Sequence, residues 1–108
     1  MPSTKGASAR GRAREREVKK KLEAQGYFVI KAGGSLGEAD LIALKAGERG
    51  MMIEVKSTAA GPFHSFGPSK REALISASEK AGLEPYLVYW PPRGELKYIG
   101  WTHWPQSK

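Results

Sequence analysis

The sequence predicts an α/β fold in which a mixed central β-sheet is flanked by α-helices. Segments of helix-forming residues and short apolar segments follow one another in the order α-β-β-β-α-β-β. With 108 residues, 40% hydrophobic and 27% charged, the chain suits one folded domain. Because a chain of this length lies near the lower limit for a core that is stable by itself, we expect an oligomer.

The two predicted helices are indicated by composition and by glycine stops. Residues 11–25 are mostly Arg, Glu, Lys, Ala and Leu, which are good helix formers, and Gly26 ends the segment. The second helix is expected over residues 70–80, before Gly82. Residues 1–10 are poor in apolar groups and rich in Ser, Gly, Ala and charge, which predicts a disordered basic arm. A single domain then spans residues 11–108.

Five apolar segments predict the strands of the sheet. They are residues 27–31 (YFVIK), 40–44 (DLIAL), 51–57 (MMIEVKS), 86–90 and 96–101. We expect a turn over residues 45–50 and a loop of about a dozen residues (TAAGPFHSFGPS) after the third strand. A loop that long in a small domain is usually functional.

The positive charge of the chain is concentrated at its N-terminal end. Six of the seven net positive charges lie within residues 1–21, which hold eight lysines and arginines and two glutamates. Such a segment indicates a phosphate-binding arm and helix. The alternative is a solvated tail that keeps the protein soluble.

Several classes of site are excluded by composition. The absence of cysteine rules out disulfides and thiolate-bound metals, and the chain has two histidines, so a metal would rest mainly on carboxylates. This favours a hard cation such as Mg²⁺. No apolar run approaches the roughly 18 residues of a membrane span, and no signal peptide is visible, so we expect the protein to stay in the compartment where it is made.

Three charged residues of the predicted sheet form a candidate reactive cluster. Glu54 and Lys56 are two residues apart in a strand and therefore share a face. Alone, they could be a surface ion pair. Asp40, however, is the one charge in an apolar strand, and a short turn between the strands makes them neighbours, so Asp40 and Glu54 can converge on one cation. Lys56 could then orient or deprotonate a water, or stabilise the transition state.

The first predicted helix adds a carboxylate to this cluster. Glu15, Val18 and Leu22 fall on one helical face, so we expect Glu15 to point toward the sheet. Glu17 lies across the helix, where an ion pair with Lys21 is expected. The alternative for Glu15 is an ordinary acid of the helix surface.

The order of a helical Glu, then GYFVIKAGGS, ADLIAL and IEVKS, is similar to that of the archaeal-type Holliday junction resolvases. This branch of the PD-(D/E)XK nucleases also occurs in phages, and the resemblance covers about residues 14–101. It implies a PD-(D/E)XK nuclease-like fold and cleavage of four-way DNA junctions with Mg²⁺, for which Mn²⁺ would substitute. It also implies no small-molecule cofactor, no membrane, and the cytoplasm of a prokaryotic cell or phage-infected host. Glu38 stands where the superfamily has its Pro.

The resemblance also assigns roles to individual residues. Glu15, Asp40, Glu54 and Lys56 match the family's catalytic set, with the three carboxylates as metal ligands. The family links the position of Ser35 to catalysis and the position of Lys31, where it often has Arg, to DNA. We also expect DNA contacts from basic residues of the arm and helices and from loop aromatics, namely Lys5, Arg10, Arg12, Arg14, Arg16, Phe63, Phe66, Lys70 and Arg71. For Phe63 and Phe66 the alternative is that they anchor the loop to the core.

Six aromatic residues gather near the C-terminal end of the chain and predict a homodimer. A domain this small cannot bury them all, and a two-fold dimer would cover what remains. A junction resolvase must nick two opposed strands, which also requires two sites. Two other functions remain open: a nuclease for flaps, forks or duplex DNA, and a non-catalytic DNA-binding module. The six residues are Tyr86, Tyr89, Trp90, Tyr98, Trp101 and Trp104.

Overall fold

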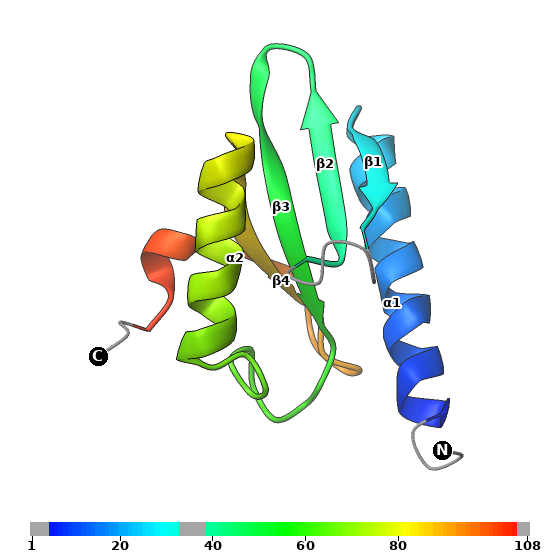
Figure 1. The fold of residues 1–108 in the computed structure, drawn as a ribbon. Coiled ribbons are helices and arrows are strands. Elements are labelled where there is room, and N and C mark those ends of the chain that lie inside the picture. The colour runs from blue at the N-terminus through cyan, green and yellow to red at the C-terminus, as the bar shows by residue number, and fades with distance from the viewer. Residues whose placement is uncertain (1–4, 33–38, 106–108) are drawn as a thin grey trace.

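The computed structural model describes the backbone of residues 5–32 and 39–105, and side chains from residue 11 onward. It confirms the predicted order α-β-β-β-α-β-β and adds a short 3-10 helix near the C-terminal end (Figure 1). The elements are α1 (Lys5–Ala24), β1 (Phe28–Lys31), β2 (Leu41–Lys45), β3 (Glu48–Lys56), α2 (Pro68–Ala81), β4 (Glu84–Tyr89), β5 (Lys97–Gly100) and the 3-10 helix η2 (Trp101–His103).

The five strands form one mixed sheet in the order β1-β2-β3-β4-β5. All neighbouring pairs are antiparallel except β3 and β4, which run parallel from Met51 opposite Glu84 to Lys56 opposite Tyr89. Parallel strands need a crossover, and α2 supplies it. The predicted mixed sheet with flanking helices is therefore confirmed.

The two helices cover opposite faces of the sheet (Figure 1). On one face, Val18 and Leu22 of α1 are buried against apolar residues of β1 to β4. On the other face, Leu74 of α2 packs with Met52 and Leu87. Because each helix covers a separate core, the sheet forms the central layer. The start of β2 and the end of β3 lie near α1 and near the loop that precedes α2.

Two boundaries differ from the sequence expectations by more than two residues. The helix α1 begins at Lys5, so residues 5–10 of the expected disordered arm are helical. Its first residues include Ala7, Ala9 and Arg10, which favour helix strongly enough to extend it past Gly6. Residues 1–4 lie outside the described part.

The turn between β2 and β3 is also shorter than expected. It consists of Ala46 and Gly47 alone, because Gly47 adopts a left-handed φ of 79° that lets the hairpin close tightly. As a result β3 already begins at Glu48, where a longer turn over residues 45–50 was expected.

The exposed apolar surface lies mainly on β1 and β2, not among the C-terminal aromatics. Tyr89 and Trp104 are buried, while Tyr98 and Trp101 keep about two fifths of their surface exposed. Phe28 is 67% exposed, and Ile30 and Leu44 are also exposed. No helix in the described ranges is both long and apolar enough to span a membrane.

Candidate active site

Asp40 is fixed at the start of β2 by three hydrogen bonds. Its backbone amide donates to the carbonyl of Ile53 (2.8 Å), and its carbonyl accepts from the amide of Ala32 (2.9 Å). Its carboxylate oxygen Oδ2 accepts from the backbone amide of Val55 (2.7 Å). Asp40 is therefore held against β3 beside Glu54, as expected for strands that are neighbours.

Glu54 and Lys56 lie side by side near the end of β3. The Nζ atom of Lys56 is 3.4 Å from Oε2 of Glu54, and each side chain is less than one fifth exposed. Burial of both groups distinguishes them from a freely solvated surface pair, for which little stabilisation is expected. The strand thus presents a carboxylate and an ammonium group together in a shielded position.

Glu15 approaches the same cluster from helix α1. Its neighbours on that face, Val18 and Leu22, are fully buried, which confirms that this face packs on the sheet. The Nζ atom of Lys31 on β1 lies 3.7 Å from Oε1 of Glu15. The structure therefore brings Glu15 and Lys31 together, and Asp40 lies close enough to interact with Glu15.

The three carboxyl groups hold their protons more tightly than solvated acids do. Burial, together with the negative charge of Asp40, raises the pKa of Glu54 to about 7. Burial and Asp40 also raise the pKa of Glu15. Burial raises the pKa of Asp40, against the opposing effects of the Val55 hydrogen bond and the Lys56 charge. Asp40 thus interacts with both glutamates, and a cation bound beside it would stabilise the ionised forms of these acids.

The donor set suits a hard cation that keeps part of its own hydration. Among the residues that the structure describes, no three His, Cys, Asp or Glu side chains are arranged to hold a metal by themselves. Mg²⁺ usually takes one or two carboxylates and completes its shell with water and phosphate oxygens. Asp40 and Glu54 fit that requirement. Ser35, expected in the same site, lies outside the described residues.

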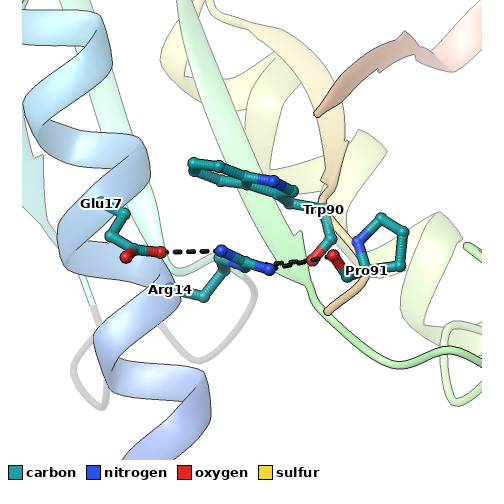
Figure 2. Close-up of polar contacts among 4 residues, drawn as sticks. All are labelled: Arg14, Glu17, Trp90 and Pro91. Carbon is teal, nitrogen blue, oxygen red and sulfur yellow. Dashed lines mark hydrogen bonds and ion pairs between the residues drawn. The ribbon is translucent and has the colours of Figure 1, made fainter. Parts of the chain in front are cut away.

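Arg14, expected to contact DNA, instead joins helix α1 to the end of β4 (Figure 2). Its Nε donates to the carbonyl of Trp90 (3.1 Å) and its Nη2 to the carbonyl of Pro91 (2.9 Å). Its Nη1 donates to Oε1 of Glu17 (2.8 Å), and the guanidinium lies 4.1 Å from the centre of the Trp90 ring. The expected pair between Glu17 and Lys21 is wrong, because Arg14 takes Glu17 and Lys21 lies over the Trp90 ring.

Phe66 and Arg71, also expected on DNA, are buried in the loop and at the start of α2. Phe66 packs edge-to-face on Trp104, with ring centres 5.1 Å apart. Arg71 is 6% exposed and donates from Nη1 to the carbonyl of Phe66 (2.7 Å). Phe63 is partly buried against the same core. These contacts correct the assignment of Phe66 and Arg71 and support the anchoring alternative for both phenylalanines.

The other expected basic contacts remain accessible on the surface. Arg12, Arg16, Lys31 and Lys70 are exposed, and the side chains of Lys5 and Arg10 lie outside the described part. Arg12 and Arg16 flank Glu15 along α1, while Lys31 reaches it from β1. A phosphate backbone could approach the carboxylate cluster along these residues.

A groove beside Lys56 was not predicted from the sequence. It encloses about 640 Å³, and its lining includes Gly11 of α1 and, from the end of β3 and the following loop, Lys56, Ser57, Thr58, His64 and Ser65. The hydroxyl groups directly after the E-x-K motif were the available signal, but nothing in the sequence showed that the loop would fold back to form a wall.

Three comparisons relate this arrangement to known proteins. A family model described as archaeal Holliday junction resolvase matches residues 6–104. The chain is 41% identical over 90 residues to the crossover junction endodeoxyribonuclease Hjc of Methanocaldococcus jannaschii. The matched region covers 83% of this chain and 65% of that relative's length.

A solved structure shows the same fold. Hjc of Archaeoglobus fulgidus, described as a Holliday junction resolvase from an archaeal hyperthermophile, superposes with a TM-score of 0.79 at 22% identity, over 92% of this chain and 79% of that one. The fold, the order of the elements and a family match that spans nearly all residues agree with one another. The protein therefore belongs to the archaeal Holliday junction resolvase family.

Proposed function

We propose that this protein is a metal-dependent endonuclease that resolves four-way DNA junctions. The observation that carries the proposal is the convergence of Glu15, Asp40, Glu54 and Lys56 at one end of the sheet, with all three carboxyl pKa values raised. Perturbed acids that converge in a shielded position are typical of active sites. The family membership and the named relative support junction DNA as the substrate.

Asp40 and Glu54 would hold a Mg²⁺ or Mn²⁺ ion, with Glu15 completing the acidic set. When bound, such an ion polarises water and neutralises charge on the phosphate. The chain's own residues supply the remaining functions. The Val55 amide fixes the orientation of Asp40 through Oδ2, and Lys56 lies where its ammonium can orient water or stabilise the added negative charge of the transition state.

The DNA strand would approach along the basic residues that surround this cluster. Arg12, Arg16 and Lys31 lie near Glu15, and Lys70 follows the loop that forms one wall of the groove. Contacts of this kind go to phosphate oxygens and position the strand without reading its sequence. Selectivity for a branch would then come from the shape of the DNA that reaches both sites of a dimer.

The apolar face of β1 and β2 is our candidate surface for that dimer. Phe28 pairs with Leu44 and Ile30 with Ile42 across the two strands, so all four side chains share one face of the sheet. Ile42 continues the face into a groove of about 600 Å³ beside α2. A second copy is the occupant that fits best, because a two-fold pair provides the two active sites that opposed nicks require.

Light scattering of the purified protein tests the dimer. Phe28→Glu, which places a charge in the patch, should yield a monomer, whereas Tyr98→Glu, at an exposed aromatic residue of β5, should remain dimeric. A wild-type protein that is monomeric at all micromolar concentrations would rule out the dimer. A dimeric Phe28→Glu variant would place the interface elsewhere.

Cleavage of a labelled four-way junction tests the activity. The protein should introduce paired nicks with Mg²⁺ and none with EDTA, and it should cut the junction faster than a flap, a fork or plain duplex of the same length. Absence of metal-dependent nicks over a range of pH and salt would refute the enzyme and leave the DNA-binding alternative. Faster cutting of flaps or duplex would retain the nuclease and change its substrate.

A further inference from the structure

Trp90 joins the helix that carries Glu15 to the strand that carries Lys56. It follows β4 directly, and its backbone amide donates to the carbonyl of Lys56 (2.8 Å). Its own carbonyl accepts from Nε of Arg14 (3.1 Å), the residue that precedes Glu15. One peptide segment therefore contacts both parts of the cluster, although Arg14 and Trp90 are 76 positions apart.

Arg14 makes this connection with its whole guanidinium group. Nε and Nη2 donate to two successive carbonyls, those of Trp90 and Pro91, while the plane of the group lies against the Trp90 ring (Figure 2). The side chain is 17% exposed. A charged, planar fork that is stacked and shielded gives directional restraint that an exposed lysine pair does not.

Directional restraint matters at this point because the core contacts of α1 with the sheet are apolar, and the ion pair of Glu15 with Lys31 of β1 is long at 3.7 Å. Val18 and Leu22 pack in the core, but hydrophobic contacts are non-directional and fix neither the rotation nor the height of a helix closely. The hydrogen bonds of Arg14 fix both, one residue from Glu15. A helix rotated without them would move the Glu15 carboxylate relative to Asp40.

We propose that Arg14 is a positioning residue for DNA cleavage: by binding the Trp90 and Pro91 carbonyls, it holds Glu15 in register with Asp40 and Lys56. The inference rests on the proposed nuclease function. It assigns to Arg14 a role in the protein interior in place of the DNA contact that its charge suggested.

A charge-neutral pair of double variants isolates this role. R14M/E17Q removes the Arg14 contacts, and K19M/E23Q removes an exposed ion pair of 2.7 Å on the same helix, without changing the net charge in either case. Single-turnover cleavage by R14M/E17Q should fall about 10- to 100-fold, because small misplacements of catalytic groups have effects of this size. Cleavage by K19M/E23Q should stay within about twofold of wild type.

Three further measurements separate positioning from DNA contact and from general stability. Junction affinity without metal should be unchanged in R14M/E17Q, and the thermal midpoint shows that the protein is folded at the assay temperature. Hydrogen exchange at the Trp90 amide should accelerate in R14M/E17Q and not in K19M/E23Q. R14K keeps the charge but lacks the fork, so it should remain impaired.

Combination with Glu15→Gln gives the decisive result. If Arg14 acts through Glu15, then R14M/E17Q should reduce the residual rate of the Glu15→Gln protein by less than about twofold. The positioning role would be overturned if the two losses multiplied fully, or if R14M/E17Q cleaved at the wild-type rate. It would also be overturned if R14K cleaved at the wild-type rate while R14M/E17Q bound DNA more weakly. A wild-type protein that makes no nicks would instead refute the proposed function, and the exchange result would still report on the Arg14 connection.

Discussion

The carboxylate of Asp40 accepts a hydrogen bond from the backbone amide of Val55, which lies between Glu54 and Lys56 in the sequence. This 2.7 Å bond connects the acid that directly precedes β2 to the strand that carries the E-x-K motif. It uses Oδ2 and leaves Oδ1 for another partner. Asp40 is thus oriented by the fold before any ion or DNA binds.

Asp40→Asn should separate this structural bond from the chemistry. An asparagine carbonyl oxygen can still accept from the Val55 amide, so the thermal midpoint should change little. The loss of a charged metal ligand should reduce cleavage by more than about 100-fold, since the charge stabilisation that an ion supplies amounts to several kcal/mol. Junction binding should stay at least as tight, because a negative charge near phosphate is removed. Weak junction binding with undiminished cleavage would contradict the role of Asp40 as a metal ligand. Asp40→Ala, which also removes the hydrogen bond with the Val55 amide, serves as the control.

The raised pKa of Glu54 predicts how stability changes with pH. The folded protein keeps this proton up to about pH 7, whereas an unfolded glutamate releases it near 4.5. The metal-free folded state therefore binds more protons between these values, so stability falls as pH rises from 4.5 to 7 and then levels off. The change should be on the order of 3 kcal/mol, and Glu54→Gln should flatten it.

The same proton competes with the metal. Because ligating carboxylates must be ionised, the Mg²⁺ concentration for half-maximal cleavage should fall as the pH rises through about 7. Urea unfolding in EDTA and metal titrations across this range measure the two effects. An apo-protein whose stability rises from pH 5 to 7 would contradict the buried, protonated form of Glu54.

Phe66→Leu should lower stability and leave DNA affinity unchanged. The ring is almost fully buried and packs edge-to-face on Trp104, so its replacement loses core contacts worth about 1–2 kcal/mol. A base-stacking role would predict the reverse pattern. Chemical unfolding and junction titration of the same preparation decide between the two roles.

The basic arm should contribute to DNA affinity through its charge. Lys5→Gln with Arg10→Gln removes two positive charges from the start of α1 without shortening the helix. If both contact phosphate, the slope of log affinity against log salt should become shallower by up to about two units. An identical slope would leave the arm with a role in solubility alone, and deletion of residues 1–10 provides the comparison.

The mixed sheet and the order of the elements along the chain could be predicted because the strands are short apolar segments. The cluster could be predicted because Asp40, Glu54 and Lys56 lie in or beside two strands joined by a turn. Their proximity follows from that hairpin alone. The helix start and the two-residue turn at Gly47 were harder to place, because several boundaries are compatible with the same local composition.

The roles of Arg14 and Arg71 could not be predicted, since both depend on contacts that are made only in the folded chain. In the sequence of a basic helix, every arginine suggests a DNA contact, whichever way its side chain points. The acceptors of Arg14 are the backbone carbonyls of Trp90 and Pro91, and because every residue has a backbone carbonyl, the sequence does not indicate this contact. The same holds for the bond from Arg71 to the carbonyl of Phe66.

The two acids of α1 allow a test of the helix orientation itself. Glu15 is mostly shielded beside Lys31, whereas the side chain of Glu17 is 53% exposed and pairs with Arg14. Glu15→Gln should therefore lose most cleavage, raise the Mg²⁺ requirement and still bind junctions. Glu17→Gln should have a small effect, because Arg14 keeps both carbonyl acceptors and the Trp90 ring. Cleavage rates at several Mg²⁺ concentrations distinguish the two variants, and an inactive Glu17→Gln protein beside an active Glu15→Gln protein would show that a different face of α1 serves the active site.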